Sequence, residues 1–384
     1  MKSKSPIFFI AVVIVLSTAF LTGCFPAGDP YERSSPDAGM MENNLPESGH
    51  IAQELSESVK INADVDIPDN AEWRVFDVAL KEFTEDDISS FLSAFQNGEV
   101  TEEYHSESGL APGYEGTNLT FADGSYLACD AGQLLFNAPA YYKRDYENEI
   151  MGTSYFLRDD LGEIYINDVI PNLDKEDAVA AVQDAITALG ISVSDPPTIY
   201  ALDYETMTSR WEDYITKDGT PAIPWQEDEG AYVVVYREAF EGVPVTDRGY
   251  VEANQDVFCT GGRIMGVFSR KGLICMSLGG IYEPLNSGET DQLLPLDGAI
   301  DVLARKYTDM LVTEPIQVTR IEASLVPYPS SDEPGALQLI PAWVFWCRQS
   351  ATASDAKGEY QSTSFFPVIV NGLTGAELRI EGTL

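Results

Sequence analysis

The side chains that could do acid–base chemistry are two histidines among a large excess of carboxylates. The 384-residue chain contains 62 Asp and Glu, 23 Lys and Arg, and only two histidines, His50 and His105. His105 lies two residues after Glu103 and could act as a general base beside carboxylates. We expect instead that His105 is a solvated loop residue and that His50 belongs to a linker. Neither histidine therefore predicts a catalytic site.

Two carboxylates could also hydrolyse a glycosidic bond, but the sequence offers too many pairs to single one out. Aromatic residues could form a platform on which a sugar ring stacks, although core packing is our preferred interpretation. These residues are Tyr141, Tyr142, Tyr146, Trp211 and Trp225. The motifs of zinc peptidases, serine hydrolases, P-loop proteins and dinucleotide-binding enzymes do not occur in the sequence. We therefore predict that the protein is not an enzyme, with a cell-surface carbohydrate-binding protein or a carboxylate-dependent hydrolase as the alternative.

No metal site and no cofactor site are predicted. Asp64, Asp66 and Asp69 have carboxylates at the spacing of calcium ligands, but the segment lacks the glycine and the terminal glutamate of an EF-hand loop. Two histidines are also too few for a multi-histidine metal site.

The residue with the most specific predicted chemistry is Cys24. A short basic head precedes a predominantly apolar stretch, residues 7–20, which is too short to span a membrane but suits the central region of a signal peptide. Leu21-Thr22-Gly23-Cys24 follows directly and resembles the lipobox of bacterial lipoproteins, in which the cysteine thiolate receives a diacylglycerol. We therefore predict a lipoprotein signal peptide over residues 1–23, lipidation of Cys24, and anchoring at the outer face of the cell membrane.

The charge makes nucleic acid an improbable partner. The formal net charge is −39, and removal of residues 1–23 leaves 21 Lys and Arg against 62 Asp and Glu, a net charge of −41. Such a field repels phosphate backbones and anionic lipid headgroups. We expect contact with the membrane through the lipid on Cys24 and a protein partner at the cell surface that is basic or carries cations. The alternative is that the acidic residues only keep the surface soluble.

The order of sequence patterns predicts a tether followed by an α+β unit. Residues 24–62 are rich in Pro, Gly, Ser, Asn and Glu and are predicted to be a flexible tether. An α+β unit is predicted over residues 63–170. It would contain a helix that begins at Thr84-Glu85-Asp86-Asp87 and a hairpin at Asp123-Gly124. A further strand is expected over residues 163–167.

Two helix-plus-meander modules are predicted after this unit, over residues 171–290 and 291–384. Apolar residues at helical spacing predict a helix after Asp174 that stops at Gly190, and a second helix from Leu296. Each helix precedes several segments with the character of antiparallel strands. The sequence therefore predicts an α+β fold in which antiparallel sheets each carry a helix packed on one face.

The closing segments of the chain resemble a known family. Leu339-Ile340-Pro341-Ala342-Trp343-Val344-Phe345 and the later turn Asn371-Gly372-Leu373-Thr374-Gly375 are similar to the last strands of PepSY-like domains and of YycI/YycH-type extracytoplasmic regulators of Gram-positive bacteria. The chain departs from that pattern at Gly372, where alanine is more usual. The resemblance covers about the last ninety residues well and the module from Leu173 more loosely. It implies tandem PepSY-like modules that bind or regulate and carry no catalytic residues.

Four cysteines remain after lipidation, and the sequence leaves their state open. They are Cys129, Cys259, Cys275 and Cys347, all in apolar strand contexts. Cys259 and Cys275 could form a disulfide, but free buried thiols are also common in such contexts. Taken together, the patterns predict a membrane-anchored extracytoplasmic lipoprotein that acts as a non-catalytic binding or regulatory module.

Overall fold

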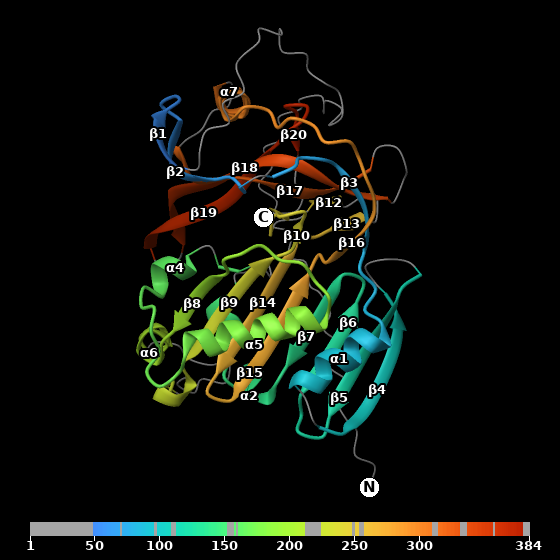
Figure 1. The fold of residues 1–384 in the computed structure, drawn as a ribbon. Coiled ribbons are helices and arrows are strands. Elements are labelled where there is room, and N and C mark those ends of the chain that lie inside the picture. The colour runs from blue at the N-terminus through green and yellow to red at the C-terminus, as the bar shows by residue number, and fades with distance from the viewer. Residues whose placement is uncertain are drawn as a thin grey trace.

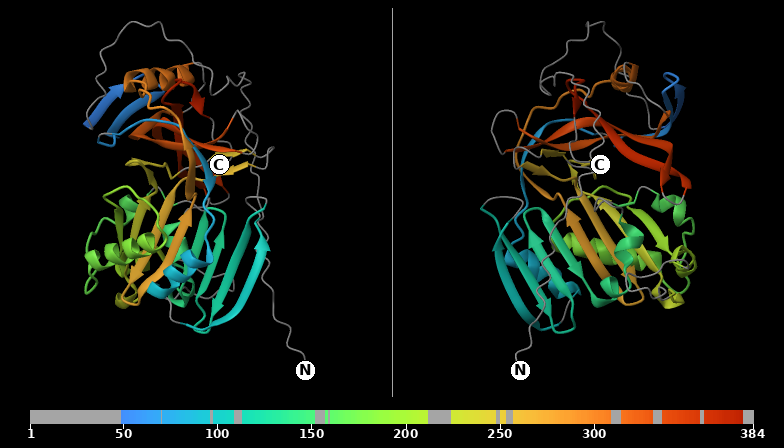
Figure 2. Two further views of the ribbon diagram at one scale, coloured as in Figure 1. Left: turned by 45° about the vertical axis from the view of Figure 1, so that its right-hand side comes forward. Right: turned by 180° about the vertical axis from the view of Figure 1, so that it is seen from behind.

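The computed structural model shows two antiparallel-rich sheets stacked one above the other (Figures 1 and 2). The structure describes residues 49–378 except for a set of short segments, namely 70, 96–97, 109–112, 152–156, 159, 212–223, 248–249, 253–256, 309–313, 331–335 and 356–357. The predicted signal peptide, Cys24 and most of the predicted tether lie outside the described residues. No helix among the described residues is long and apolar enough to cross a membrane.

The sheet drawn lower in Figure 1, called sheet 1 here, has eight antiparallel strands in the order β4-β5-β6-β7-β15-β14-β9-β8. Its strands are β4 (Val100–Glu107), β5 (Glu115–Phe121), β6 (Tyr126–Asp130), β7 (Gln133–Asn137), β8 (Thr198–Leu202), β9 (Ala231–Arg237), β14 (Arg263–Ser269) and β15 (Gly272–Gly279). Two helices, α1 (Glu85–Phe95) and α5 (Lys175–Ala188), lie side by side on one face. Sheet 1 is thus two helix-plus-meander units joined edge to edge where β7 pairs with β15.

Local sequence explains both helices. The Thr84 hydroxyl accepts a hydrogen bond from Asp87 N, and the Asp87 carboxylate accepts one from Thr84 N, so a capping box starts α1. The Asp174 carboxylate accepts a hydrogen bond from Glu176 N at the start of α5. Gly266 on β14 lets α5 approach the sheet, because a Cβ there would lie 2.2 Å from Val182 Cγ2.

The second half of sheet 1 is buried on both faces, which explains the nearly continuous apolar runs of β9 and β14. One face packs under α5, and the other packs against short helices and a helical turn. These are α2 (Pro139–Lys143), α3 (Tyr146–Ile150), α4 (Leu161–Ile164), α6 (Tyr204–Trp211) and the 3-10 turn η1 (Glu227–Glu229). The strand predicted over residues 163–167 is therefore wrong, since residues 161–164 form the helical turn α4.

The other sheet, called sheet 2, follows the order β1-β2-β17-β18-β19-β20, with β3 pairing both β16 and β18. Its strands are β1 (Gly49–Glu54), β2 (Val59–Asp66), β3 (Phe76–Leu80), β16 (Tyr282–Ser287), β17 (Ile316–Pro329), β18 (Leu337–Asp355), β19 (Gly358–Asn371) and β20 (Glu377–Leu378). The helix α7 (Leu296–Thr308) packs its apolar stripe into the core of this sheet. A third helix-plus-meander unit therefore runs from α7 to β20.

Two short hairpins lie between the sheets (Figure 1). They are β10 (Ala239–Phe240) with β11 (Val243–Pro244), and β12 (Tyr250–Glu252) with β13 (Val257–Cys259). Phe240, Val243 and Cys259 from these hairpins belong to the core of sheet 2. The hairpins thus join the two bodies.

The α+β fold class is confirmed, with helices packed on antiparallel sheets. The predicted hairpin at Asp123-Gly124 is present between β5 and β6. The predicted tether is wrong for residues 49–62, because β1 and β2 form a hairpin there and β2 adds parallel to β17. The signal is the alternation of Val59, Ile61, Ala63 and Val65, all of which are buried.

The strands also divide differently from the predicted boundaries at residues 170 and 290. The segment 63–170 does not form a sheet of its own, since β3 belongs to sheet 2 and β4 to β7 belong to sheet 1. Likewise β16, at the end of the segment 171–290, pairs with β3 in sheet 2. Long-range strand pairing, which local periodicity does not encode, decides these memberships.

Candidate functional site

The two sheets meet along β17, where a cleft opens beside the contact. Val245 forms a parallel bridge with Leu325, and Thr246 N donates a hydrogen bond of 2.8 Å to Leu325 O. The strands β11 and β13 also contact β17. Because these contacts hold sheet 2 against the end of β9, side chains from both sheets face one another next to them.

An ion pair links the two sheets at this position. Arg237, the last residue of β9, places Nη1 2.9 Å from Glu322 Oε2 on β17. Glu322 is 1% exposed, and Arg320 Nη2 lies 3.5 Å from the same carboxylate oxygen. Asp66 on β2 adds a second carboxylate 3.6 Å from Arg237 Nη2. A buried carboxylate is therefore held between two guanidinium groups, one from each sheet.

A cavity of about 900 Å³ lies beside this ion pair and is lined by residues from both sheets. Its most distinctive members are four arginines, Arg158, Arg237, Arg320 and Arg348. The whole chain has only 13 arginines, so nearly a third of them line one cavity. The cavity has the size typical of small-ligand sites.

The other two arginines are also fixed in place. Arg158 donates two parallel hydrogen bonds of 2.9 Å to the Asp160 carboxylate. Burial alone would raise the pKa of Asp160, but these bonds from Arg158 lower it below its usual value. Arg348 donates a hydrogen bond of 3.1 Å to Gln317 Oε1 and lies 3.4 Å from Glu163 on α4. Since a guanidinium has five N–H donors, each arginine keeps donor capacity beyond these contacts.

Aromatic rings complete the cleft. The Arg320 guanidinium lies over the Trp346 ring, 4.6 Å from its centroid, and Tyr200 and Phe365 also line the cavity. A guanidinium held against an aromatic ring keeps its edge available for a planar anion such as a carboxylate. The arrangement therefore suits a ligand that has an anionic group next to a flat or apolar part.

Carboxylates also line the cleft, but they are less concentrated there than the arginines. The acidic lining residues are Asp66, Asp69, Glu163, Asp195 and Asp247. These are five of the 62 acidic residues of the chain, against four of its 23 basic ones. Asp160 and Glu322, which pair with Arg158 and Arg237, bring the carboxylates to seven against four guanidinium groups. Positive charge is therefore more concentrated at this cleft than in the whole chain, where 62 acidic residues face 23 basic ones.

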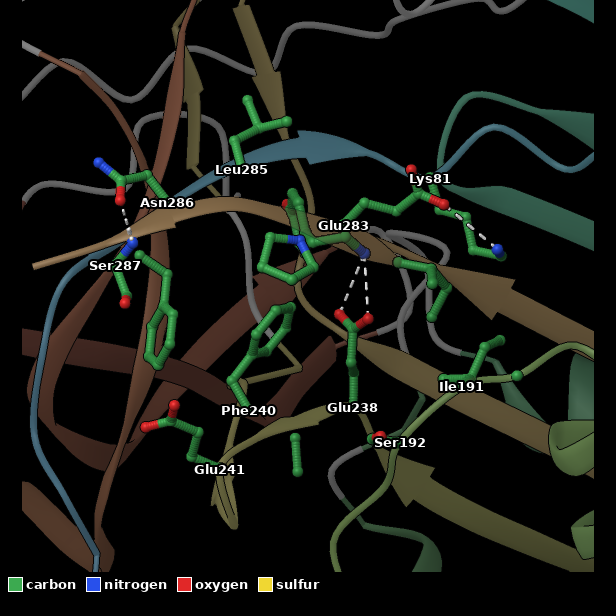
Figure 3. Close-up of a pocket in the computed structure, with 16 residues that line it drawn as sticks. Lys81, Ile191, Ser192, Glu238, Phe240, Glu241, Glu283, Leu285, Asn286 and Ser287 are labelled. Carbon is green, nitrogen blue, oxygen red and sulfur yellow. Dashed lines mark hydrogen bonds and ion pairs between the residues drawn. The ribbon is translucent and has the colours of Figure 1, made fainter.

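A second cavity of about 540 Å³ is lined in part by β10 and the turn that follows it (Figure 3). Both oxygens of the Glu238 carboxylate accept from Tyr282 N, at 3.1 and 3.2 Å. Burial raises the pKa of Glu238 well above its usual value, although the bond from Tyr282 N and the charge of Lys81 oppose this shift. Phe240 and Glu241 line the same cavity. It presents carboxylates and a single lysine, so it does not share the character of the arginine-lined cleft.

The histidines are not brought together. His50 is exposed on β1, where its Nδ1 lies 2.8 Å from Asp64 Oδ1 and its Nε2 lies 3.1 Å from Asn62 Oδ1. His105 is on β4 at the far edge of sheet 1, with Nε2 3.0 Å from Glu103 Oε1. The predictions that His50 lies in a linker and His105 in a loop are wrong, since each residue lies in a strand. The expected solvent exposure of both side chains is confirmed.

The aromatic residues considered as a sugar platform are mostly core. Tyr141, Tyr146 and Trp225 are buried in one cluster, with the Tyr146 and Trp225 ring centroids 4.8 Å apart. Trp211 packs against this cluster, and Tyr142 is exposed and lies outside it. The preferred interpretation of core packing is confirmed for the three buried rings. The carbohydrate alternative therefore loses its aromatic platform.

The remaining candidate residues have structural surroundings. No group of three or more His, Cys, Asp or Glu among the described residues could hold a metal ion. The four cysteines of the described chain are free thiols, each of them buried. Cys259 lies in β13 and Cys275 in β15, two strands that do not pair with each other, and the two cysteines form no disulfide.

The turn that carries the family resemblance is built as predicted. The Asn371 side chain accepts hydrogen bonds from Leu373 N and Thr374 N, at 2.8 and 3.0 Å. Gly375 has a φ of +73°, which favours glycine. At Gly372 the packing favours glycine, because a Cβ there would lie 2.2 Å from Leu293 Cδ1.

A solved structure shares this fold. It is an uncharacterized protein from Eubacterium rectale ATCC 33656, with a TM-score of 0.68 and 16% sequence identity, covering 86% of this chain and 94% of that chain. At this identity the likeness shows the fold alone. No protein-family model matches the chain, and no curated protein matches it in sequence.

Sequence reasoning did not find the cleft. Its arginines come from four separate segments around residues 158, 237, 320 and 348, and no motif connects them. The available signal was the rarity of arginine in the chain, together with the charged Arg320 and Glu322 inside a strand that is largely buried.

Proposed function

We propose that the protein is a membrane-anchored extracytoplasmic lipoprotein that acts as a non-catalytic binding module, with the cleft between the sheets as its ligand site. The ligand is a small molecule or peptide end with a carboxylate or similar planar anion next to a flat group. The observation that carries this proposal is the gathering of four anchored arginines and Trp346 in one cavity. Charge-assisted hydrogen bonds from fixed guanidinium groups contribute about 1.5–3 kcal/mol each.

The geometry of the cleft favours binding over catalysis. Its charged lining residues are arginines and carboxylates, and neither histidine of the chain lines it. The arginines are held by acidic partners, as Arg158 is by Asp160, so the site is preorganised before a ligand arrives. The similarity of the C-terminal strands to PepSY-like and YycI/YycH-type modules supports the same class of function.

The ligand site is tested by titration calorimetry with trimesate, a flat tricarboxylate, as the probe. We expect trimesate to bind and its uncharged triamide not to bind. The variant Arg158→Gln/Arg348→Gln should weaken binding at least tenfold, by the loss of about 1.5–3 kcal/mol per contact. Arg270→Gln is the matched control, because Arg270 donates to Pro171 O outside the cleft. Equal binding of trimesate by both variants would overturn the assignment.

The anchor is tested separately by labelling cells with palmitate. Wild-type protein should carry the label and sediment with membranes, and Cys24→Ser should do neither. A labelled Cys24→Ser protein, or an unlabelled wild type, would overturn the lipoprotein assignment and leave the cleft unaffected.

A further inference from the structure

The outer edge of sheet 1 is a long exposed strand. β4 pairs with β5, and no other described strand pairs with it. Nearly all of its residues are exposed, and Tyr104 is 65% exposed. An edge strand presents alternate N–H and C=O groups outward, which can accept another strand. The outer side of β4 is therefore a template for strand addition.

β4 has only some of the features that commonly protect such edges, namely three Glu residues and a bulge near its start. It contains no Pro and no Lys, and its register with β5 runs without interruption from Glu102 to Glu107. A bulge occurs between Val100 and Glu102, at one end of the strand. The six residues 102–107 thus offer a regular stretch long enough to pair with an added strand.

The chain segment that contains β4 is strongly acidic, and Lys81, which precedes it, is paired with Asp87 at 3.6 Å and with Glu283 at 3.3 Å. Residues 82–142, which include α1 and the whole meander from β4 to β7, contain eleven Asp and Glu and no Lys or Arg. Glu102, Glu103 and Glu107 lie on β4 itself. A second copy of this chain pairing along β4 would bring these carboxylates against their equivalents, which disfavours it. A basic strand would be attracted to the same edge.

A groove beside β4 suits basic side chains with aliphatic stems. A cavity of about 400 Å³ lies between α1 and β4, with Ile88, Leu92 and Leu119 among its apolar lining residues. Glu85 and Glu103 also line it. A Lys or Arg side chain can lie along the apolar residues while its charged end reaches these carboxylates.

We propose that β4 binds an extended basic segment of a partner protein, which adds to sheet 1 as a further strand. Alternate side chains of that segment would be Lys or Arg directed to the groove beside α1. This surface is independent of the arginine-lined cleft, because the cleft is lined by β8, at the opposite edge of sheet 1.

The test uses hydrogen exchange on the mature chain with Cys24→Ser. The probe is a short synthetic peptide in which Lys alternates with Val and Thr, and the control peptide has Glu in place of Lys. We expect the Lys peptide to slow exchange of the amides of residues 102–107 by about tenfold or more and to bind more weakly as salt rises. The Glu peptide should leave these amides unchanged.

Charge-reversal variants separate this edge from the general charge of the protein. Glu102→Lys/Glu103→Lys should abolish protection by the Lys peptide, whereas Glu314→Lys/Glu359→Lys, with the same change in net charge at exposed positions of sheet 2, should retain it. Trimesate binding should be the same in both variants.

Three results would overturn the proposal. The first is an absence of protection at residues 102–107, and the second is equal protection by the Glu peptide. The third is that the amides of β4 are already protected without the peptide. Protection that increases with protein concentration would indicate that a second copy of the chain covers β4. Protection that requires residues 24–48 would indicate that the chain's own N-terminal segment covers it.

Discussion

Arg237 on β9 and Glu322 on β17 join the two sheets through an ion pair of 2.9 Å in which Glu322 is 1% exposed and Arg237 21% exposed. The carboxylate comes from one sheet and its main countercharge from the other. Misplacement of the sheets would therefore leave the Glu322 carboxylate with Arg320, on its own strand, as its remaining countercharge. The pair thus specifies how the sheets are docked as well as one wall of the cleft.

Removal of one partner of this pair should be costly. Arg237→Ala should lower the free energy of unfolding by up to about 3–5 kcal/mol, because the Glu322 carboxylate would stay buried with Arg320 as its remaining partner. Urea unfolding measures this, with Arg270→Ala as the control at a more exposed position. The double variant Arg237→Met/Glu322→Met should be more stable than Arg237→Ala. A loss below 1 kcal/mol for Arg237→Ala would contradict the proposed role of the pair.

Trp343 should act as core and Trp346 as part of the cleft. Trp343 is fully buried, and its Nε1 donates a hydrogen bond of 2.7 Å to Leu294 O, next to the start of α7. Trp343→Ala should lower the free energy of unfolding by about 3–5 kcal/mol. The measurement is thermal or urea unfolding, and an unchanged melting temperature would show that the packing around Trp343 is misjudged.

Burial of Glu238 makes stability depend on pH. Its pKa is raised well above the ordinary value of 4.5, chiefly by burial, so the folded state holds a proton more tightly than the unfolded state. The contribution of Glu238 to the free energy of unfolding is therefore fully present below about pH 4.5. It falls as the pH rises from there to the pKa of Glu238 in the folded protein, by up to about 1.4 kcal/mol per pH unit. Glu238→Gln should remove this fall.

The pH dependence is measured by urea unfolding of wild type and Glu238→Gln at a series of pH values. The difference in unfolding free energy between the variant and the wild type should grow in favour of the variant above pH 4.5. A constant difference across the series would mean that Glu238 has an ordinary pKa in the folded protein.

The buried thiols should be unreactive in the folded protein. Burial is the main cause that raises the pKa of Cys129, Cys259, Cys275 and Cys347 to about 12. At pH 8 the thiolate fraction is then very small, and the thiols are also shielded. In a Cys24→Ser protein, iodoacetamide at pH 8 should modify none of the four until denaturant is added. Mass spectrometry counts the adducts, and rapid native labelling would contradict this burial.

Local sequence predicted those parts of the fold that local interactions decide. Thr84 and Asp87 indicate the start of α1, and Asp174 and Gly190 indicate the two ends of α5. Asp123-Gly124 predicts a hairpin. These predictions are possible because caps and turns depend on residues a few positions apart. The strand around Trp343 was expected from its run of apolar residues and its resemblance to the last strands of PepSY-like domains, and Trp343 is buried. The hairpin of β1 and β2 was missed although Val59, Ile61, Ala63 and Val65 alternate, because the polar composition of the preceding residues dominated the interpretation.

Neither the pairing of distant strands nor the position of the cleft could be predicted from local sequence patterns. Nothing near β2 indicates that it pairs parallel with β17, more than 250 residues later, and nothing near β7 specifies its pairing with β15. The cleft depends on the docking of the two sheets, since Arg237 reaches Glu322 only after they have met. Residues that are brought together only by tertiary contacts have no characteristic spacing in the sequence by which they could be recognised.

The most direct test of the ligand site is fluorine NMR of protein labelled with 5-fluorotryptophan and titrated with trimesate. Trp343 and Trp346 lie on opposite faces of β18, one in the core beneath α7 and the other in the cleft. The resonance assigned to Trp346 through the Trp346→Phe variant should shift progressively until saturation, while that of Trp343 stays in place. A titration in which the Trp346 resonance does not move, or moves no more than that of Trp343, would contradict the assignment of the cleft as the anion-binding site.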